Sequence, residues 1–77
     1  MMTNYINKTR TILSGFEFIW LLRILDKCDT WEHKRIASRF VYNTLTKQRE
    51  ASGTQLYLLK HKMIQPYKKL LVNELSR

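Results

Sequence analysis

The sequence is poor in the residues that build disulfides, metal sites and glycine-rich loops. Its 77 residues include one cysteine, one proline and two glycines. An intramolecular disulfide needs two cysteines, so Cys28 cannot form one. Two glycines are too few for a glycine-rich phosphate-binding loop. We therefore expect a domain that is held together by an apolar core, in a reducing setting.

Acidic residues and long apolar runs are also scarce. Six Asp and Glu stand against 14 Lys and Arg, which gives a net charge of +8. The longest apolar run, from Phe16 to Leu25, is interrupted by Glu17 and Arg23 and is far shorter than the ~20 residues of a membrane span. A secretory signal pattern is also lacking. These features predict a cytoplasmic protein with no membrane partner, and the charge favours an anionic one.

Metal binding and catalysis have little support in the sequence. Cys28, His33 and His61 form no Cys-x-x-Cys or His-x-x-x-His pair, whereas a zinc site needs three or four converging ligands. No turn motif accompanies Cys28 as a nucleophile. We expect no metal, no cofactor and no catalytic residues, hence a protein that is not an enzyme. A ribonuclease using His33 and His61 would leave little trace in the sequence, and that alternative stays open.

The apolar periodicity predicts an all-α fold. We expect a compact three-helix domain over residues 14–77, preceded by a polar, basic arm over residues 1–13. The apolar residues recur at helical spacing in three segments, and strand-type alternation is absent. The expected helices cover residues 16–27, 30–51 and from 55 onward.

Local signals place the helix ends. Asp29 is expected to cap the second helix, with Glu32 at its third position. Gly53 is expected to end that helix in a left-handed conformation, with Thr54 as the next cap. Proline disfavours a helical residue before it and lacks an N–H, so the third helix should kink or split at Pro66.

The helix expected over residues 30–51 has a basic and polar stripe along one side. On a wheel of 100° per residue, five residues fall within about 80° of one another. These are Arg35, Arg39, Tyr42, Thr46 and Arg49. The opposite side is expected to face the core and holds Ile36, Ala37, Phe40, Val41, Thr44 and Leu45.

This stripe predicts nucleic-acid binding. Arginine binds phosphate bidentately and stacks on bases, and tyrosine can stack or donate a hydrogen bond. The mixture of Arg and Tyr favours RNA over DNA, with contacts to the backbone and weak sequence preference. Lys8 and Arg10 would assist from the arm. Lys60 and Lys62 would extend the surface if the third helix packs antiparallel to the second. A basic helix face that serves only solubility is the plain alternative.

The third helix has a main apolar stripe that consists of Leu56, Leu59, Met63, Tyr67 and Leu70. Apolar residues outside this stripe bear on self-association. Tyr57, Leu58, Ile64 and Val72 cannot all be internal in a domain of this size. They indicate either a first helix that is wrapped on two sides or a homodimer surface, and both remain open. A different class of function also remains open: a protein-binding inhibitor that docks its basic face on an acidic patch of a host protein.

In size and composition the chain resembles the small, basic early proteins of tailed bacteriophages. That resemblance covers no motif and transfers no residue roles. It implies a counter-defence factor that binds and blocks a host component, such as a toxin or a nuclease, rather than an enzyme. It leaves nucleic acid and host protein open as targets.

Overall fold

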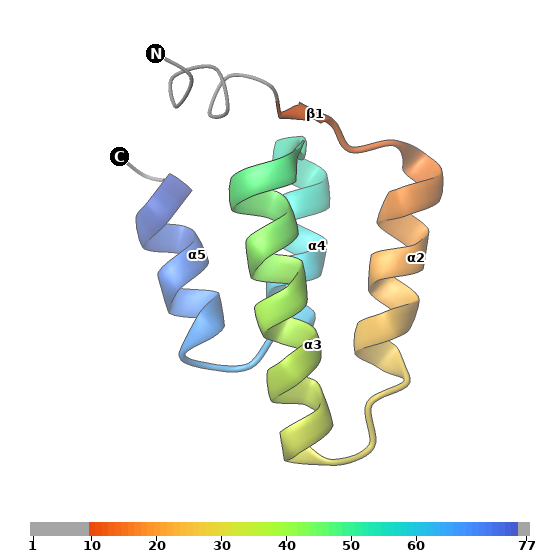
Figure 1. Cartoon of the computed structure of the whole chain (residues 1–77), viewed down its shortest axis with the longest axis vertical. Helices are drawn as coiled ribbons and strands as arrows, with labels where there is room; N and C mark the ends of the chain where they lie inside the picture. The colour runs from red at the N-terminus through yellow and green to blue at the C-terminus, as the bar shows by residue number, and fades with distance from the viewer. Residues whose placement is uncertain (1–9, 76–77) are drawn as a thin grey trace.

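The computed structural model describes residues 10–75, which form a mostly helical domain (Figure 1). In chain order the elements are β1 (Thr11–Ile12), α2 (Gly15–Asp26), α3 (Trp31–Asn43), the π-helical turn η1 (Thr44–Gln48), β2 (Arg49–Glu50), α4 (Gly53–Lys62) and α5 (Tyr67–Leu75). The expected helical character is confirmed. The expected count differs, because the third helix is divided into α4 and α5, and the two short strands were not anticipated.

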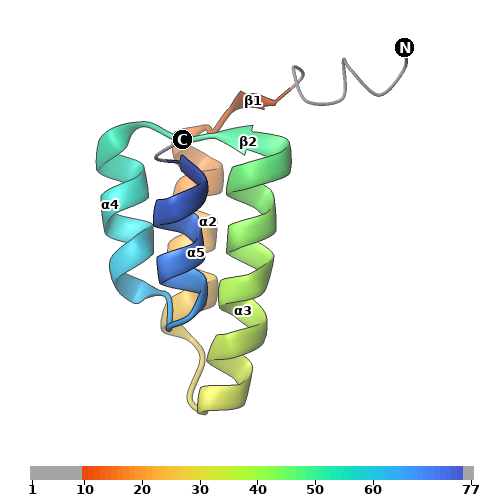
Figure 2. The same cartoon turned by 90° about the vertical axis from the view of Figure 1, so that its left-hand side faces the viewer.

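The helices stand side by side around one apolar core. α2 packs against α3 and α4, and α5 also packs against α3 and α4. Consequently α3 and α4 occupy diagonal corners of the bundle, and α4 lies behind α3 in Figure 1. Figure 2 shows the other diagonal, with α5 in front of α2. The buried apolar residues are Leu13, Leu21, Leu25, Ala37, Val41, Leu45, Leu59, Met63 and Leu71.

Hydroxyl side chains cap three helices. Ser14 caps α2 in a full capping box with Glu17. Thr30 caps α3 by accepting a hydrogen bond from the His33 N–H, so the prediction of Asp29 is wrong by one residue. Ser52 caps α4 in a capping box with Gln55.

The expected turn at residues 52–54 therefore needs correction. Gly53 is the first residue of α4 and does not have a positive φ, so it is not a left-handed stop. Thr54 lies inside the first turn rather than at the cap. Ser52 is two residues closer to the preceding strand than Thr54, and its hydroxyl caps a helix that begins directly after the short connection.

The second helix ends earlier than expected. α3 runs to Asn43 and continues as the π-helical turn η1 to Gln48, whereas the prediction extended it to Ala51. The Thr44 hydroxyl donates to the Phe40 carbonyl at 3.0 Å. Such bonds to the preceding turn compete with regular α-helical pairing. Arg49 is already extended, and β2 pairs in parallel with β1.

The predicted break at Pro66 is confirmed. α4 ends at Lys62, Met63 is extended, and α5 begins at Tyr67, directly after a cis Gln65–Pro66 peptide bond. The connecting segment is tied to α3, because the Ile64 N–H donates to the buried Ser38 hydroxyl at 3.1 Å.

The described part of the predicted arm is packed on the domain. Leu13 is buried in the core, and its N–H donates to the Glu50 carbonyl at 2.9 Å. The Arg10 guanidinium donates to the Leu45 carbonyl at 2.8 Å. Lys8 lies outside the described residues. Over residues 10–75, no helix is long and apolar enough to cross a bilayer.

Candidate binding surface

Two arginines of the predicted stripe remain together on α3. Arg39 is exposed, and Arg35 is half-buried with its guanidinium carbon 6.0 Å from the centroid of the Trp31 ring. One turn of helix separates the two residues, so they share a side of α3. Neither forms an ion pair with a carboxylate among the described side chains. Both guanidinium groups are therefore available to an anionic partner.

The remaining stripe residues are engaged elsewhere. Tyr42 is half-buried and packs against Tyr67 of α5, with ring centroids 6.2 Å apart. Its ring stabilises the contact between α3 and α5 instead of standing free for stacking. The Thr46 hydroxyl donates to the Tyr42 carbonyl at 2.8 Å. A continuous stripe of five residues is therefore not what the structure has.

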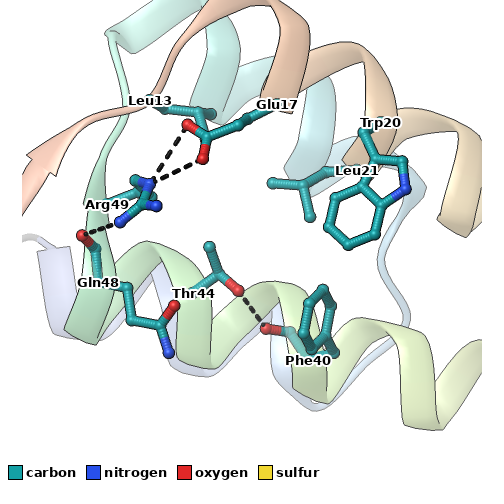
Figure 3. Close-up of a pocket in the computed structure, with 8 residues that line it drawn as sticks. All are labelled: Leu13, Glu17, Trp20, Leu21, Phe40, Thr44, Gln48 and Arg49. Atoms are coloured by element: carbon teal, nitrogen blue, oxygen red, sulfur yellow. Dashed lines mark hydrogen bonds and ion pairs between the residues drawn. The ribbon is translucent and has the colours of Figure 1, made fainter.

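Arg49 leaves the stripe because the helix ends before it. Its Nε donates to both carboxylate oxygens of Glu17 on α2, at 3.2 and 3.0 Å, and its Nη1 donates to the Gln48 carbonyl (Figure 3). The Ser14 N–H and the Arg49 side chain together lower the pKa of Glu17 from its ordinary 4.5. This pair closes one end of a small cavity of about 130 Å³ between α2 and α3. Arg49 is a structural ion-pair partner here.

The expected basic surface that joins α3 to Lys60 and Lys62 is absent from the described bundle. Both lysines lie on α4, which is diagonal to α3 and packs on α2 and α5 instead. Lys62 donates to Asp26 of α2 at 2.7 Å, and Lys60 lies 5.9 Å from the Tyr57 ring centroid. The prediction assumed antiparallel packing of neighbouring helices, and the diagonal arrangement separates the two basic sets.

The three residues considered for metal or nucleophile chemistry are dispersed. The Cys28 thiol donates to the carbonyl of Ile24, four residues earlier in the chain, at 3.2 Å. His33 is exposed on α3, and His61 on α4 packs edge-on against Tyr57 with centroids 4.4 Å apart. Among the described residues, no group of three His, Cys, Asp or Glu side chains converges on a point where a metal could bind.

An open apolar groove lies between α2 and α3, and we call it the α2–α3 groove. It has a volume of about 400 Å³. Its lining consists of Trp20, Ile24, His33, Ile36, Ala37 and Phe40. Ile36 and Phe40 were expected to face the core, yet 58% of Ile36 and 43% of Phe40 is exposed. That expectation is wrong for these two residues, because the core covers only the Ala37 and Val41 side of α3.

The outer side of α2 continues this apolar surface. Phe16, Ile19 and Trp20 are all exposed, and they recur at the spacing of one helix face. The next two turns of that face hold Arg23 and Lys27, which are also exposed. A sequence signal for this surface existed: apolar residues cover more than half of the circumference of α2, and only two neighbouring helices are present to cover them.

Comparison of the chain with protein-family models, with curated proteins and with solved structures finds no match.

Proposed function

We propose that this domain is a non-enzymatic, protein-binding inhibitor that docks its α2–α3 face on an acidic surface of a target protein. The observation behind the proposal is the α2–α3 groove, an open apolar surface whose lining includes the exposed side chains of Trp20, Ile36 and Phe40. Contiguous exposed apolar patches on small domains mark interaction surfaces. Aromatic residues and arginine are also the residue types that are enriched at the centres of protein interfaces.

The composition of this face favours protein over nucleic acid. Phosphate backbones require an array of cations, and the candidate array has lost Arg49 to Glu17 and Lys62 to Asp26. Trp20 and Phe40 pack edge to face against each other at 5.9 Å, which leaves less of each ring free for base stacking. Burial of the groove in a protein interface removes apolar area from water, and this is the larger source of free energy.

A pulldown with matched variants tests the proposal. The tagged chain is expressed in cells, and the lysate is treated with nuclease before capture. Ile36→Ser alters the groove, while Tyr57→Ser alters an equally exposed apolar residue on α4, since the two are 58% and 57% exposed. We expect a protein that survives nuclease, is lost with Ile36→Ser and is retained with Tyr57→Ser. Retention by Ile36→Ser, or loss of every partner on nuclease treatment, would contradict the proposal.

Nucleic-acid binding is the second candidate, because Arg35 and Arg39 have no carboxylate partner among the described side chains and the net charge is +8. The test is a gel-shift titration with RNA and DNA at two salt concentrations. Under this candidate, Arg35→Glu combined with Arg39→Glu abolishes the shift while the melting temperature stays nearly unchanged. A wild-type chain that shifts neither probe at low salt excludes this candidate.

A further inference from the structure

The α2–α3 groove has the dimensions of a helix-binding surface. Its lining covers one turn of α2, from Trp20 to Ile24, and two turns of α3, from His33 to Phe40, so the longer wall is about 10 Å long, the rise from i to i+7 of a helix. On α2, Trp20 and Ile24 are one turn apart, and on α3 Ile36 and Phe40 are one turn apart. A third helix laid between two neighbours contacts them at intervals of one turn, through its residues i, i+3 or i+4, and i+7.

An extended peptide suits this groove poorly. The walls are helices whose backbone groups already pair within each helix, and the lining side chains are almost all apolar. An extended segment would leave its own N–H and C=O groups without partners there, at a cost of about 1–3 kcal/mol for each buried group. A helix satisfies its backbone internally and presents only side chains, so it can enter an apolar groove without that cost.

The rim of the groove is cationic. Arg23 lies on α2 beyond Trp20, Lys27 is the C-cap of α2, and Arg39 lies on α3 one turn from Ile36; all three cations are exposed. None of them forms an ion pair within the part of the chain that the structure describes. Two exposed carboxylates, Asp29 in the connection before α3 and Glu32 in its first turn, are outnumbered by the three cations. The rim is therefore complementary to carboxylates that flank the apolar face of a partner.

The same charges disfavour a second copy of this chain as the occupant. A symmetric pair of grooves would bring Arg23, Lys27 and Arg39 of one copy close to the same cations of the other, within a molecule of net charge +8. Like charges brought together at an interface cost binding free energy unless acidic residues separate them. An acidic partner avoids that repulsion, and its carboxylates are attracted by the same cations.

We propose that the α2–α3 groove binds an amphipathic α-helix of the target protein, with apolar residues at i, i+3 or i+4, and i+7 and with Asp or Glu on both flanks. This inference rests on the proposed protein-binding function and specifies the element that is bound. Trp20, Ile36 and Phe40 are the anchors for the apolar face, and Arg23, Lys27 and Arg39 contact the acidic flanks.

The test is a selection from a displayed library of helical peptides of about 16 residues, enough to span the groove, with apolar, acidic, basic and neutral residues allowed at every outward position. We expect the enriched peptides to have an apolar stripe with acidic flanks. One enriched peptide is then synthesised, and its affinity is measured by fluorescence anisotropy against the wild type, Ile36→Ser and Tyr57→Ser. We expect Ile36→Ser to weaken binding by about tenfold or more and Tyr57→Ser to change it by less than about twofold.

Charge and salt provide the second readout. Arg23→Glu combined with Arg39→Glu should weaken the acidic peptide by about tenfold or more, and affinity should fall as NaCl rises from about 0.05 to 0.5 M. Self-association should instead become tighter as the salt concentration rises, because salt screens the repulsion between copies. A dimer in light scattering that grows with salt and excludes the peptide would assign the groove to a second copy and overturn the proposal.

The remaining outcomes also decide. Selection that yields no helix, or yields basic helices, overturns the acidic-helix proposal, as does a peptide that binds Ile36→Ser as tightly as wild type. If the pulldown nevertheless finds a groove-dependent protein, the protein-binding function stands and only the helical occupant is wrong. If the pulldown finds no such protein, the proposed function fails whatever the library gives.

Discussion

The rings of Trp20 on α2 and Phe40 on α3 stand nearly perpendicular, with centroids 5.9 Å apart and an interplanar angle of 86°. This contact joins two helices at the surface rather than in the core, since 53% of Trp20 and 43% of Phe40 is exposed. Figure 3 shows the two rings on its right-hand side, across the cavity from Arg49. It holds the walls of the groove at a fixed separation while leaving apolar surface open to a partner.

The first prediction concerns the energy of this aromatic pair. Edge-to-face pairs contribute about 0.5–1.5 kcal/mol beyond the burial of their area. We expect Trp20→Leu and Phe40→Leu each to lower the free energy of unfolding, and the double variant to lose less than the sum of the two by about 1 kcal/mol. Urea denaturation of the four proteins measures this coupling. Strict additivity would mean that the two rings do not stabilise each other.

The second prediction concerns Glu17, whose pKa is lowered below 4.5 by the Ser14 N–H and by the Arg49 side chain. A lowered folded-state pKa means that folding favours the ionised carboxylate. The resulting stability is fully present above the ordinary pKa and is lost as the pH falls through the lowered one. We expect the melting temperature to fall with acidification below about pH 4.5, and Glu17→Gln to flatten that dependence.

A matched carboxylate provides the control for this measurement. Glu50 is exposed on β2, and its side chain forms no ion pair with the described part of the chain. Glu50→Gln should leave the fall in melting temperature at acidic pH as it is in wild type. Circular dichroism melts at several pH values give both results. Equal flattening by the two variants would show that net charge, and not the contacts of Glu17, sets the acid sensitivity.

Much of the fold follows from local signals in the sequence. Ser14 caps α2, Pro66 divides the last helical segment, and Leu59 and Met63 of the apolar repeat are buried. Each of these depends on residues within one or two turns of chain: a hydroxyl before a helix, a proline with no N–H, or an apolar repeat. Periodicity and capping are therefore sufficient to find the helices.

The arrangement of the binding surface does not follow from local signals. Arg49 left the stripe because a strand pairing with residues 11–12 ends the helix, and that segment is far away in sequence. Phe40 became exposed because α2 lies against only one flank of α3, and Lys60 moved away because α4 is diagonal to α3. Helical periodicity gives the apolar face of each helix, but the neighbours decide how much of that face is covered.

The third prediction concerns Ser38, which is fully buried on α3 and accepts the Ile64 N–H at 3.1 Å. Ser38→Ala leaves that N–H without its acceptor, and we expect a loss of about 1–3 kcal/mol in the free energy of unfolding. Hydrogen exchange locates the effect. The Ile64 amide should exchange faster by more than the global loss requires, whereas the Val41 amide, inside α3, should follow the global loss. Equal acceleration of both amides would mean that the Ser38 hydroxyl does not anchor the segment between α4 and α5.

The fourth prediction tests the orientation of α2, on which the groove depends. Leu25 is fully buried, whereas 86% of Phe16 is exposed on the outer side of the same helix. Leu25→Ala should lower the free energy of unfolding by about 2–5 kcal/mol, because it removes apolar contacts and leaves a cavity. Phe16→Ala should change it by less than about 0.5 kcal/mol, although it deletes the larger side chain. Urea denaturation of both variants measures the difference. A costly Phe16→Ala together with a mild Leu25→Ala would mean that α2 is rotated, with its aromatic side turned inward and no open groove against α3.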